Sequence, residues 1–506
     1  MAISQIKKNI VANFVARSIG FVMTYLFTPL FLKFLGIESF GVIGFFSTLM
    51  GILLITDIGL TASLTRETAR LSVMDNSEKE LKNIIRTYEL IYIWLSFFIA
   101  FLVWFGASYI VNNWLKVRDL DLNQLVLAIK IMGIAIACQL PSGLYFGGLM
   151  GLQKQILANS LQLGWSLFKG LGTVIVLWLI SPTILAFTIC QLVANVLYFV
   201  ILWRSLWGSL PFDDKKIIPQ FDIKVFLLNW KYSLGIAGIS LMSTIILQAD
   251  KILVSKALPL EVLGYYTLAG TLALLPIMIA NPITSAMFPK FIALIELKDN
   301  EQLVAVYHRT CKLIALTIFP MSFTVMAFTK NILYAWTGSS IISNEGALVA
   351  SILVLGQIMQ VVTTVPFYFA SANGKTKLLL IVQMFCVIIF IPALIYLVPK
   401  YGIVGAGLAW LLMNIFIMPG YMYFLHKIYL PGQFLKWFKN DVFIPILIIV
   451  PVVLAARYIL PDTECRIFVM FQLFITWFLS SLTLLYVLPD FRKEVYLKYI
   501  SFLNKF

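Results

Sequence analysis

Long apolar segments alternate with short polar segments along the whole chain. A helix that spans a membrane needs about 20 mostly apolar residues in succession, and fourteen segments of this chain meet that requirement. They are predicted at roughly 10–32, 40–63, 84–111, 124–149, 155–180, 183–203, 230–256, 264–290, 310–330, 346–370, 377–398, 403–426, 440–460 and 466–488. The pattern predicts an all-α polytopic membrane protein with about fourteen transmembrane helices.

The chain repeats itself at an offset of 223 positions. The stretch Lys33–Leu49 aligns without a gap with Lys256–Leu272, and Tyr145–Lys154 aligns with Tyr368–Lys377. The first-copy residues that recur unchanged are Lys33, Leu35, Glu38, Gly41, Thr48, Leu49, Tyr145, Phe146, Gly151 and Lys154. The repeat unit holds six helices, an even number, so both copies keep one orientation. The sequence therefore predicts two lobes related by a parallel pseudo-twofold axis, an organisation typical of transporters.

The repeat also predicts where the chain divides. The first six-helix lobe covers residues 1–212, and the second covers residues 213–430 after a polar linker, Pro211–Lys224. Residues 431–506 hold two further helices and a tail outside the repeat. Before these helices, Gln433–Asn440 mixes aromatic residues with lysines, a composition that favours an interfacial position.

Composition and charge support the membrane assignment and set its orientation. The 506 residues are 61% hydrophobic and only 12% charged, with a mean hydropathy of +0.94, whereas soluble proteins are about 25% charged. The net charge of +15 comes with an uneven distribution: 26 of the 38 Lys and Arg residues fall on the side that holds both termini, and 8 on the other. This positive-inside bias predicts cytoplasmic termini and explains the charge without nucleic acid.

Six ionisable residues inside the predicted spans are candidates for a functional site. The cations are Arg17, Lys130, Lys169 and Lys251, and the carboxylates are Asp57 and Asp250. Charges at membrane depth are costly and mark functional sites by default. For Arg17 and Asp57, a structural salt bridge between neighbouring helices is an equally strong interpretation.

Polar side chains accompany these charges at helical spacing. The residue sets are Gln155, Asn159, Gln162, Ser166, Lys169 and Thr173; Ser240, Thr244, Gln248, Lys251 and Ser255; Asn13, Arg17, Thr24 and Thr28; Thr188, Gln191, Asn195 and Tyr198; and Gln357, Gln360, Thr364 and Tyr368. Such residues can simply hydrogen-bond across helices, at about 1 kcal/mol each. Five stripes in both lobes favour a shared hydrated cavity, and its excess of cations suits an anionic substrate such as a phosphate or pyrophosphate.

Several other features carry no catalytic or cofactor chemistry. The five cysteines lack metal-ligand or redox spacing. Asn373–Thr376 resembles the end of a P-loop, but Phe369 stands where its first glycine is required. Gly143, Gly147 and Gly151 form a small-residue row that predicts close helix packing. We expect no enzyme activity, no metal and no cofactor beyond a coupling Na⁺ or H⁺.

A series of motifs, in order along the chain, resembles a known transporter family. They are Pro29 followed by Phe34-Leu35-Gly36 and Phe40-Gly41; Asp57-Ile58-Gly59-Leu60 with Arg66 downstream; Asp250-Lys251-Ile252-Leu253 leading to Gly264-Tyr265-Tyr266; Ala372–Lys377; and Gly402–Ala406. With the 6+6+2 helix plan, they resemble the polysaccharide-transporter branch of the multidrug/oligosaccharidyl-lipid/polysaccharide flippase superfamily, the Wzx-type O-antigen flippases.

The resemblance implies two six-helix lobes around a central cationic cavity in a bacterial inner membrane. It implies ion-coupled translocation of an undecaprenyl-pyrophosphate-linked oligosaccharide, with a polysaccharide polymerase and a chain-length regulator as further candidate partners. Arg17, Lys130, Lys169 and Lys251 become head-group candidates, with Arg66 at the inner mouth. Asp57 and Asp250 become candidates for ion coupling.

Other functions remain open at this point. A lipid II flippase or a multidrug exporter of the same superfamily would share the fold, although a drug exporter is expected to have carboxylates in excess. A polysaccharide polymerase or lipid-dependent glycosyltransferase would need a larger external loop than Asn112–Asn123 or Asn331–Glu345. A major-facilitator transporter would carry a glycine-rich basic pattern in its first cytoplasmic loop, which is absent from Arg66–Glu80.

Overall fold

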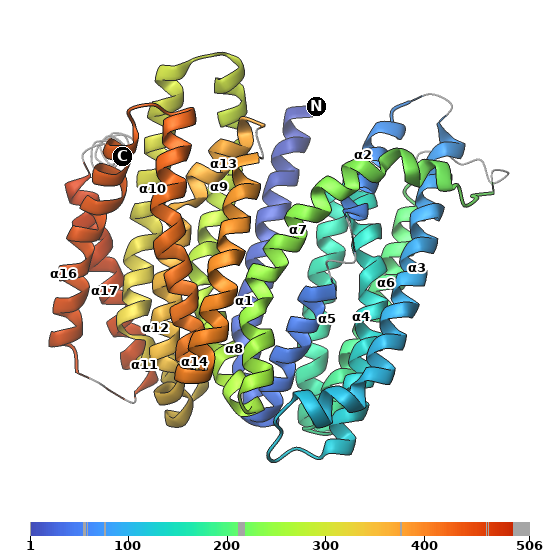
Figure 1. Ribbon diagram of the computed structural model, residues 1–506, viewed down its shortest axis with the longest axis horizontal. Helices are drawn as coiled ribbons and strands as arrows, with labels where there is room; N and C mark the ends of the chain where they lie inside the picture. The colour runs from blue at the N-terminus through green and yellow to red at the C-terminus, as the bar shows by residue number, and fades with distance from the viewer. Residues whose placement is uncertain are drawn as a thin grey trace, which may run out of the picture. The chain divides into compact units, whose positions relative to one another are not determined.

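The computed structural model is built from helices throughout its described residues (Figure 1), and so confirms the predicted all-α class. The structure describes residues 2–53, 57, 59–74, 77–210, 218–374, 377–461, 463, 465 and 466–488, and describes side chains for all of these except 2–18, 21, 223–237, 239 and 377. The helices are α1 (Ala2–Leu53), α2 (Leu60–Leu71), α3 (Glu78–Tyr109), α4 (Leu122–Gly151), α5 (Gln155–Leu179), α6 (Ile184–Trp207), α7 (Ile223–Ala257), α8 (Leu260–Ala273), α9 (Leu275–Glu296), α10 (Asn300–Ala327), α11 (Thr329–Thr337), α12 (Ser340–Val362), α13 (Thr364–Ala372), α14 (Lys377–Tyr429), α15 (Phe434–Lys436), α16 (Ile444–Ile459) and α17 (Arg466–Val487). Short π-helical turns, Ile110–Trp114 and Trp437–Phe443, follow α3 and α15.

The predicted spans correspond to these helices, with breaks that the hydrophobic pattern does not reveal. Among the described residues, eleven helical segments are long and apolar enough to cross a membrane. Two of them contain a sharp bend at a glycine of positive φ, Gly36 at 77° and Gly402 at 59°. Only glycine adopts that conformation without strain, so each bend divides one continuous helix into two spans. This accounts for the two predicted spans inside α1 and the two inside α14.

The helix boundaries follow the 223-residue offset. Shifted by that number, α3 (78–109) becomes 301–332, close to the start of α10, and α5 (155–179) becomes 378–402, the first segment of α14. Likewise α6 (184–207) becomes 407–430, which corresponds to the second segment of α14. The repeat is therefore present in the helices as well as in the motifs.

The described residues form two compact units, Met1–Gly264 and Tyr265–Phe506. In the first unit α4 packs against α3 and α6, and α5 packs against α1 (Figure 1). In the second unit α12 packs against α11 and α14, and α10 packs against α16 and α17. The lobe boundary between residues 212 and 213 stays a prediction from the repeat.

A reciprocal contact joins equivalent residues of the two copies within the first unit. An added Cβ on Gly41 would collide with the carbonyl oxygen of Leu260, and one on Gly264 would collide with that of Ile37. Leu260 is the repeat equivalent of Ile37, and Gly264 that of Gly41. Each glycine thus lets its helix approach the backbone of the other copy, as expected at a twofold-related crossing.

A loop reinforces this crossing from one end. Glu38 accepts hydrogen bonds from the backbone N–H groups of Arg118 (2.6 Å) and Asp119 (2.9 Å). The guanidinium of Arg118 in turn lies 3.4 Å from the carboxylate of Glu261, the repeat equivalent of Glu38. The loop between α3 and α4 therefore contacts both equivalent glutamates.

The glycine row of α4 packs as predicted. An added Cβ on Gly147 would lie 2.6 Å from the Cγ2 of Thr61, and one on Gly151 would collide with Thr68. Thr65 also donates a hydrogen bond from its hydroxyl to the Gly147 carbonyl at 3.0 Å. The small residues on α4 therefore pack directly against the threonines on α2, which confirms the predicted close helix packing.

Candidate functional site

Four helices of the first unit line an open cavity of about 200 Å³. Its polar and aromatic lining comes from α4, α5 and α6, namely Gln139, Ser142, Gln162, Trp165 and Tyr198. Apolar residues complete the wall: Met50, Leu53, Ile136, Leu140 and Phe146, beside Gly143. Gln162 and Trp165 are three residues apart on α5, so the helical period brings both to one face. Gln162 belongs to the polar stripe that the sequence predicts on α5.

Lys169 lies beside this cavity. Its ammonium nitrogen is 4.8 Å from the ring centroid of Trp165. Trp165 is stacked on Tyr198, with a centroid distance of 4.6 Å and an interplanar angle of 15°. Within the described residues, no carboxylate forms an ion pair with Lys169, and its ammonium group lies against the aromatic ring. A half-buried cation held this way is stabilised by the ring quadrupole.

The predicted polar stripes divide into two kinds of side chain. Buried members hydrogen-bond across helices: Gln191 donates to the hydroxyl of Thr173 at 3.1 Å, and Asn195 donates to Gln139 at 3.2 Å. These act as the interhelical glue of the simpler interpretation. Gln162 and Tyr198 instead line the cavity, and Ser166 is half-buried one turn from Gln162. The interhelical interpretation therefore holds for Gln191 and Asn195, and a hydrated cavity shared by both lobes stays a prediction.

The other candidate cations lie at separate places. Lys130 on α4 lies over the ring of Trp104, at 5.2 Å from its centroid. Lys251 is half-buried on α7. Arg17 is on α1, but its side chain is outside the described side chains, so its pairing with Asp57 stays a prediction. In the described part of the chain, neither Lys130 nor Lys251 contacts Lys169.

The two candidate carboxylates have local hydrogen bonds. Asp57 precedes α2 instead of lying within a span, and its Oδ1 accepts from the backbone N–H (3.1 Å) and hydroxyl (2.8 Å) of Thr61. Asp57 therefore satisfies a free N–H at the start of α2, as capping residues do. The Oδ1 of Asp250 accepts from the backbone N–H of Lys251 at 2.8 Å.

The remaining candidates of the cavity lining are Thr244, Gln248, Gln357 and Gln360. Thr244 and Gln360 are half-buried. Gln248 packs against Gly51, where an added Cβ would collide with its amide. Gln357 is 7% exposed, and its Oε1 has no hydrogen-bond partner in the described part of the chain. Gln248 and Gln357 are thus packed inside their own units.

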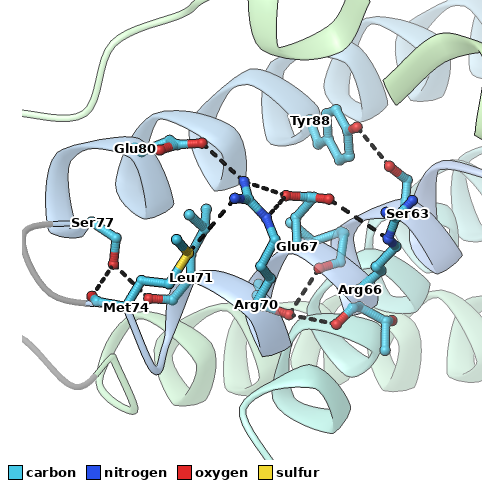
Figure 2. Close-up of polar contacts among 12 residues, drawn as sticks. Ser63, Arg66, Glu67, Arg70, Leu71, Met74, Ser77, Glu80 and Tyr88 are labelled. Atoms are coloured by element: carbon cyan, nitrogen blue, oxygen red, sulfur yellow. Dashed lines mark hydrogen bonds and ion pairs between the residues drawn. The ribbon is translucent and has the colours of Figure 1, made fainter. Parts of the chain in front are cut away.

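Arg66 lies on α2, in a charged cluster that also includes Glu67 and Arg70 of α2 and Glu80 of α3 (Figure 2). Its side chain is 56% exposed and 4.0 Å from the carboxylate of Glu67. Arg70 bridges Glu67 (2.8 Å) and Glu80 (3.1 Å). The hydrogen bond with Glu67 raises the pKa of the Arg70 guanidinium. Glu67 is therefore held mainly by Arg70, and Arg66 is the member of the cluster that projects most into solvent.

Glu89 is a buried carboxylate that the sequence pattern does not single out. Glu89 on α3 is 2% exposed, accepts a hydrogen bond from Tyr145 at 2.7 Å and pairs with Arg86 at 2.7 Å. The spacing of three residues between Arg86 and Glu89 is the signal that could have identified it. Tyr145 was identified only as a residue that recurs in the repeat.

Comparison with known proteins agrees with the fold and the repeat. The family described as "Polysaccharide biosynthesis protein" matches residues 6–294. A curated relative, "Putative O-antigen transporter" from Shigella flexneri, is 24% identical over 378 residues, which are 74% of this chain and 87% of that protein.

Solved structures of similar fold are transporters. The lipid II flippase MurJ in an inward closed conformation has a TM-score of 0.68 at 18% identity, covering 93% of this chain and 97% of that one. An inward-facing MATE-family multidrug transporter of the MOP superfamily has a TM-score of 0.66 at 14% identity, covering 83% and 99%. At these identities the likeness concerns the fold alone. The family match covers more than half of the sequence, and the chain belongs to the family of polysaccharide biosynthesis proteins.

Proposed function

We propose that this protein is a flippase that moves undecaprenyl-pyrophosphate-linked oligosaccharide repeat units across the bacterial inner membrane, with both termini in the cytoplasm. The observation that carries the proposal is Lys169, a cation in the middle of α5 with no ion-pair partner in the described residues. A fixed cation at membrane depth is retained when a function requires it. A pyrophosphate is the anionic group that such a lipid substrate would present to it.

The relatives support the lipid-linked substrate class. The curated relative is named for O-antigen transport, and one similar fold is named for lipid II flipping. Alternating access would be driven by Na⁺ or H⁺, with Asp57 and Asp250 as coupling candidates. A polysaccharide polymerase and a chain-length regulator are the partners that would use the translocated units.

Lipid II transport is the second candidate, because MurJ has a similar fold over almost the whole chain. Multidrug export is less well supported. Among the described residues, no carboxylate lines the first-unit cavity, and Lys169 beside it would repel a cationic drug.

The test is deletion of the gene, followed by analysis of surface polysaccharide and of the lipid-carrier pool. We expect loss of polymer, with single pyrophosphate-linked units accumulating on the cytoplasmic face. Units that accumulate on the periplasmic face would mean that translocation proceeds without this protein, and would favour a polymerase. Unchanged polymer with loss of viability would favour lipid II as the substrate.

A further inference from the structure

Within the first unit, the loop between α3 and α4 contacts the turn between α7 and α8, which belongs to the second copy of the repeat. The indole N–H of Trp114 donates a hydrogen bond to the hydroxyl of Ser255 at 3.0 Å. The carbonyl oxygen of Lys116 accepts a hydrogen bond from the backbone N–H of Leu260 at 3.0 Å, and its ammonium group donates to the Ala257 carbonyl at 2.6 Å. The loop therefore binds this turn through its backbone as well as its side chains.

The same loop also binds the first copy. The backbone N–H groups of Arg118 and Asp119 donate hydrogen bonds to the carboxylate of Glu38. The guanidinium of Arg118 also lies 3.4 Å from Glu261, the repeat equivalent of Glu38. Each glutamate is three residues before the glycine at which the two helices cross. Residues 114–119, which we call the strap, therefore connect the two copies beside their crossing point.

The contacts of the strap are of a kind that can open and close. Of its six residues, only Leu115 is a buried apolar side chain. The other contacts are hydrogen bonds and one ion pair, and water would replace them once the strap leaves, so that each contributes little net stability. An interface held by polar contacts is typical of parts of a protein that move relative to one another.

The second copy joins the equivalent helices without such a strap. Neutral residues replace its aromatic and cationic side chains, since Thr337, Ser339 and Ile341 stand at the positions of Trp114, Lys116 and Arg118. There the hydroxyl of Ser339 accepts a hydrogen bond from the backbone N–H of Ile342 and caps α12. The aromatic and cationic residues of the strap are therefore not required to connect two helices, and their contacts with the turn between α7 and α8 need another reason.

We propose that the strap is a latch, closed in this structure, which must release the turn between α7 and α8 in each transport cycle. This proposal rests on the proposed function, because it takes the protein to work by alternating access. A face that opens and closes needs contacts that are present in one state and absent in the other. The strap lies at the end of the first unit away from the N-terminus (Figure 1). With cytoplasmic termini this is the outer face, from which the substrate would leave.

The first test fixes the strap with a disulfide. Lys116 and Pro259 form a β-bridge, so their Cα atoms have the spacing of adjacent strands, about 5 Å, at which a disulfide can form. Lys116→Cys and Pro259→Cys are combined in the full-length protein after its native cysteines are replaced by alanine. Because release is part of turnover, we expect oxidation to lower newly made surface polysaccharide about tenfold, and a reductant to restore it to within about twofold. Each single variant should be insensitive to the oxidant.

The second test follows the opening of the strap without reference to the substrate. Ser255 is 1% exposed and bonded to Trp114. In the protein without native cysteines, the thiol of Ser255→Cys should therefore react slowly with a membrane-impermeant maleimide, at the rate of release. Glu38→Ala removes the acceptor of two strap N–H groups and should raise that rate about fivefold. The matched control is the repeat equivalent, Glu261→Ala, which loses only an exposed ion pair and should raise it about twofold or less.

Normal polysaccharide in the oxidised double variant would overturn the latch, because transport would then proceed with the strap fixed. An unreactive thiol in Ser255→Cys, both alone and combined with Glu38→Ala, would also overturn it and would make the strap a permanent brace. If the double variant does not insert into the membrane, the labelling rates decide alone. Failure of the proposed function is distinguishable, because deletion of the gene would then leave polysaccharide unchanged, whereas the labelling rates do not depend on what is transported.

Discussion

α5 in the first unit and the first segment of α14 in the second unit are equivalent by the repeat, yet they carry opposite chemistry. On α5, Gln162 and Trp165 line a cavity and Lys169 lies against the tryptophan. The equivalent residues of α14 include Phe385 and Ile388, which are 55% and 60% exposed and suited to lipid. Helix length and position are kept in both copies, whereas the polar chemistry is kept in only one. The repeat thus supplies the scaffold, and divergence between its copies marks the site.

The same comparison explains two equivalent glycines in different ways. Gly151 on α4 is packed so closely against Thr65 and Thr68 that no Cβ fits. Gly374 has open space around it but a φ of 71°. One glycine is required for close approach, and the other for a left-handed turn.

Gly151→Val should have the largest effect among the variants considered. The new side chain would be forced into the backbone of α2, which is expected to cost about 3 kcal/mol or more. We expect little folded protein, measured as the monodisperse fraction on size-exclusion chromatography in detergent. The control is Gly374→Ala, where only the backbone strain of about 1 kcal/mol applies. Equal losses in the two variants would contradict the assignment of different roles.

Lys169→Gln tests the difference in charge between the copies. It should lower surface polysaccharide at least tenfold, because the cation proposed to receive the pyrophosphate is lost. Stability should fall by about 1 kcal/mol, the contribution of a cation–π contact. Quantitative polysaccharide analysis and a thermal unfolding curve would measure the two effects.

Its matched control is Lys400→Gln in the second unit. Lys400 also lies over an aromatic ring, that of Tyr396, but its side chain is exposed whereas that of Lys169 is half-buried. Normal polysaccharide in the Lys169 variant would refute the head-group role. An equal loss of polysaccharide in the Lys169 and Lys400 variants would show that it results from losing a cation–π contact, and not from losing the cation beside the cavity.

Glu38 and Glu261 are equivalent by sequence but unequal in burial. Glu38 is 7% exposed and accepts two backbone hydrogen bonds from the loop between α3 and α4. The Glu261 side chain is 31% exposed and pairs with an arginine that is itself 61% exposed. Glu38→Ala should cost about 1–3 kcal/mol, because two N–H groups lose their acceptor. Glu261→Ala should cost less than about 1 kcal/mol.

Thermal or denaturant unfolding of both variants in the same detergent would measure this difference. An effect of Glu261→Ala as large as that of Glu38→Ala would mean that the loop is held equally by both copies. In that case the asymmetry of burial would have no energetic consequence.

The sequence predicted the helices, the repeat and the packing of the glycine row because these depend on hydrophobic length and residue size. It could not predict the breaks before α2 and α9, because both interrupt continuous apolar stretches. The break before α2 places Asp57 at the start of a helix, where it bonds to Thr61.

The cavity was predictable only in part. The polar stripe of α5 follows from its spacing, and Lys169 and Gln162 were identified from it. The contact between Trp165 and Tyr198 depends on how α5 and α6 are rotated about their own axes. No local sequence pattern specifies that rotation. For the same reason, Gln191 and Asn195 could not be separated from the cavity lining before their interhelical bonds were known.

Tyr421→Phe should have the smallest effect and sharpens the comparison most. Tyr421 is the equivalent of Tyr198, but its hydroxyl is buried and has no hydrogen-bond partner among the described residues. Removing an unsatisfied buried hydroxyl should leave stability unchanged or raise it by up to about 1 kcal/mol. Thermal unfolding and the amount of surface polysaccharide would measure the outcome. Because Tyr198 lines the first-unit cavity and stacks on the tryptophan that contacts Lys169, only Tyr198→Phe should lower polysaccharide. If Tyr421→Phe lowers it as well, the second copy takes part in recognition, and the polar lining of the first copy does not by itself define the substrate site.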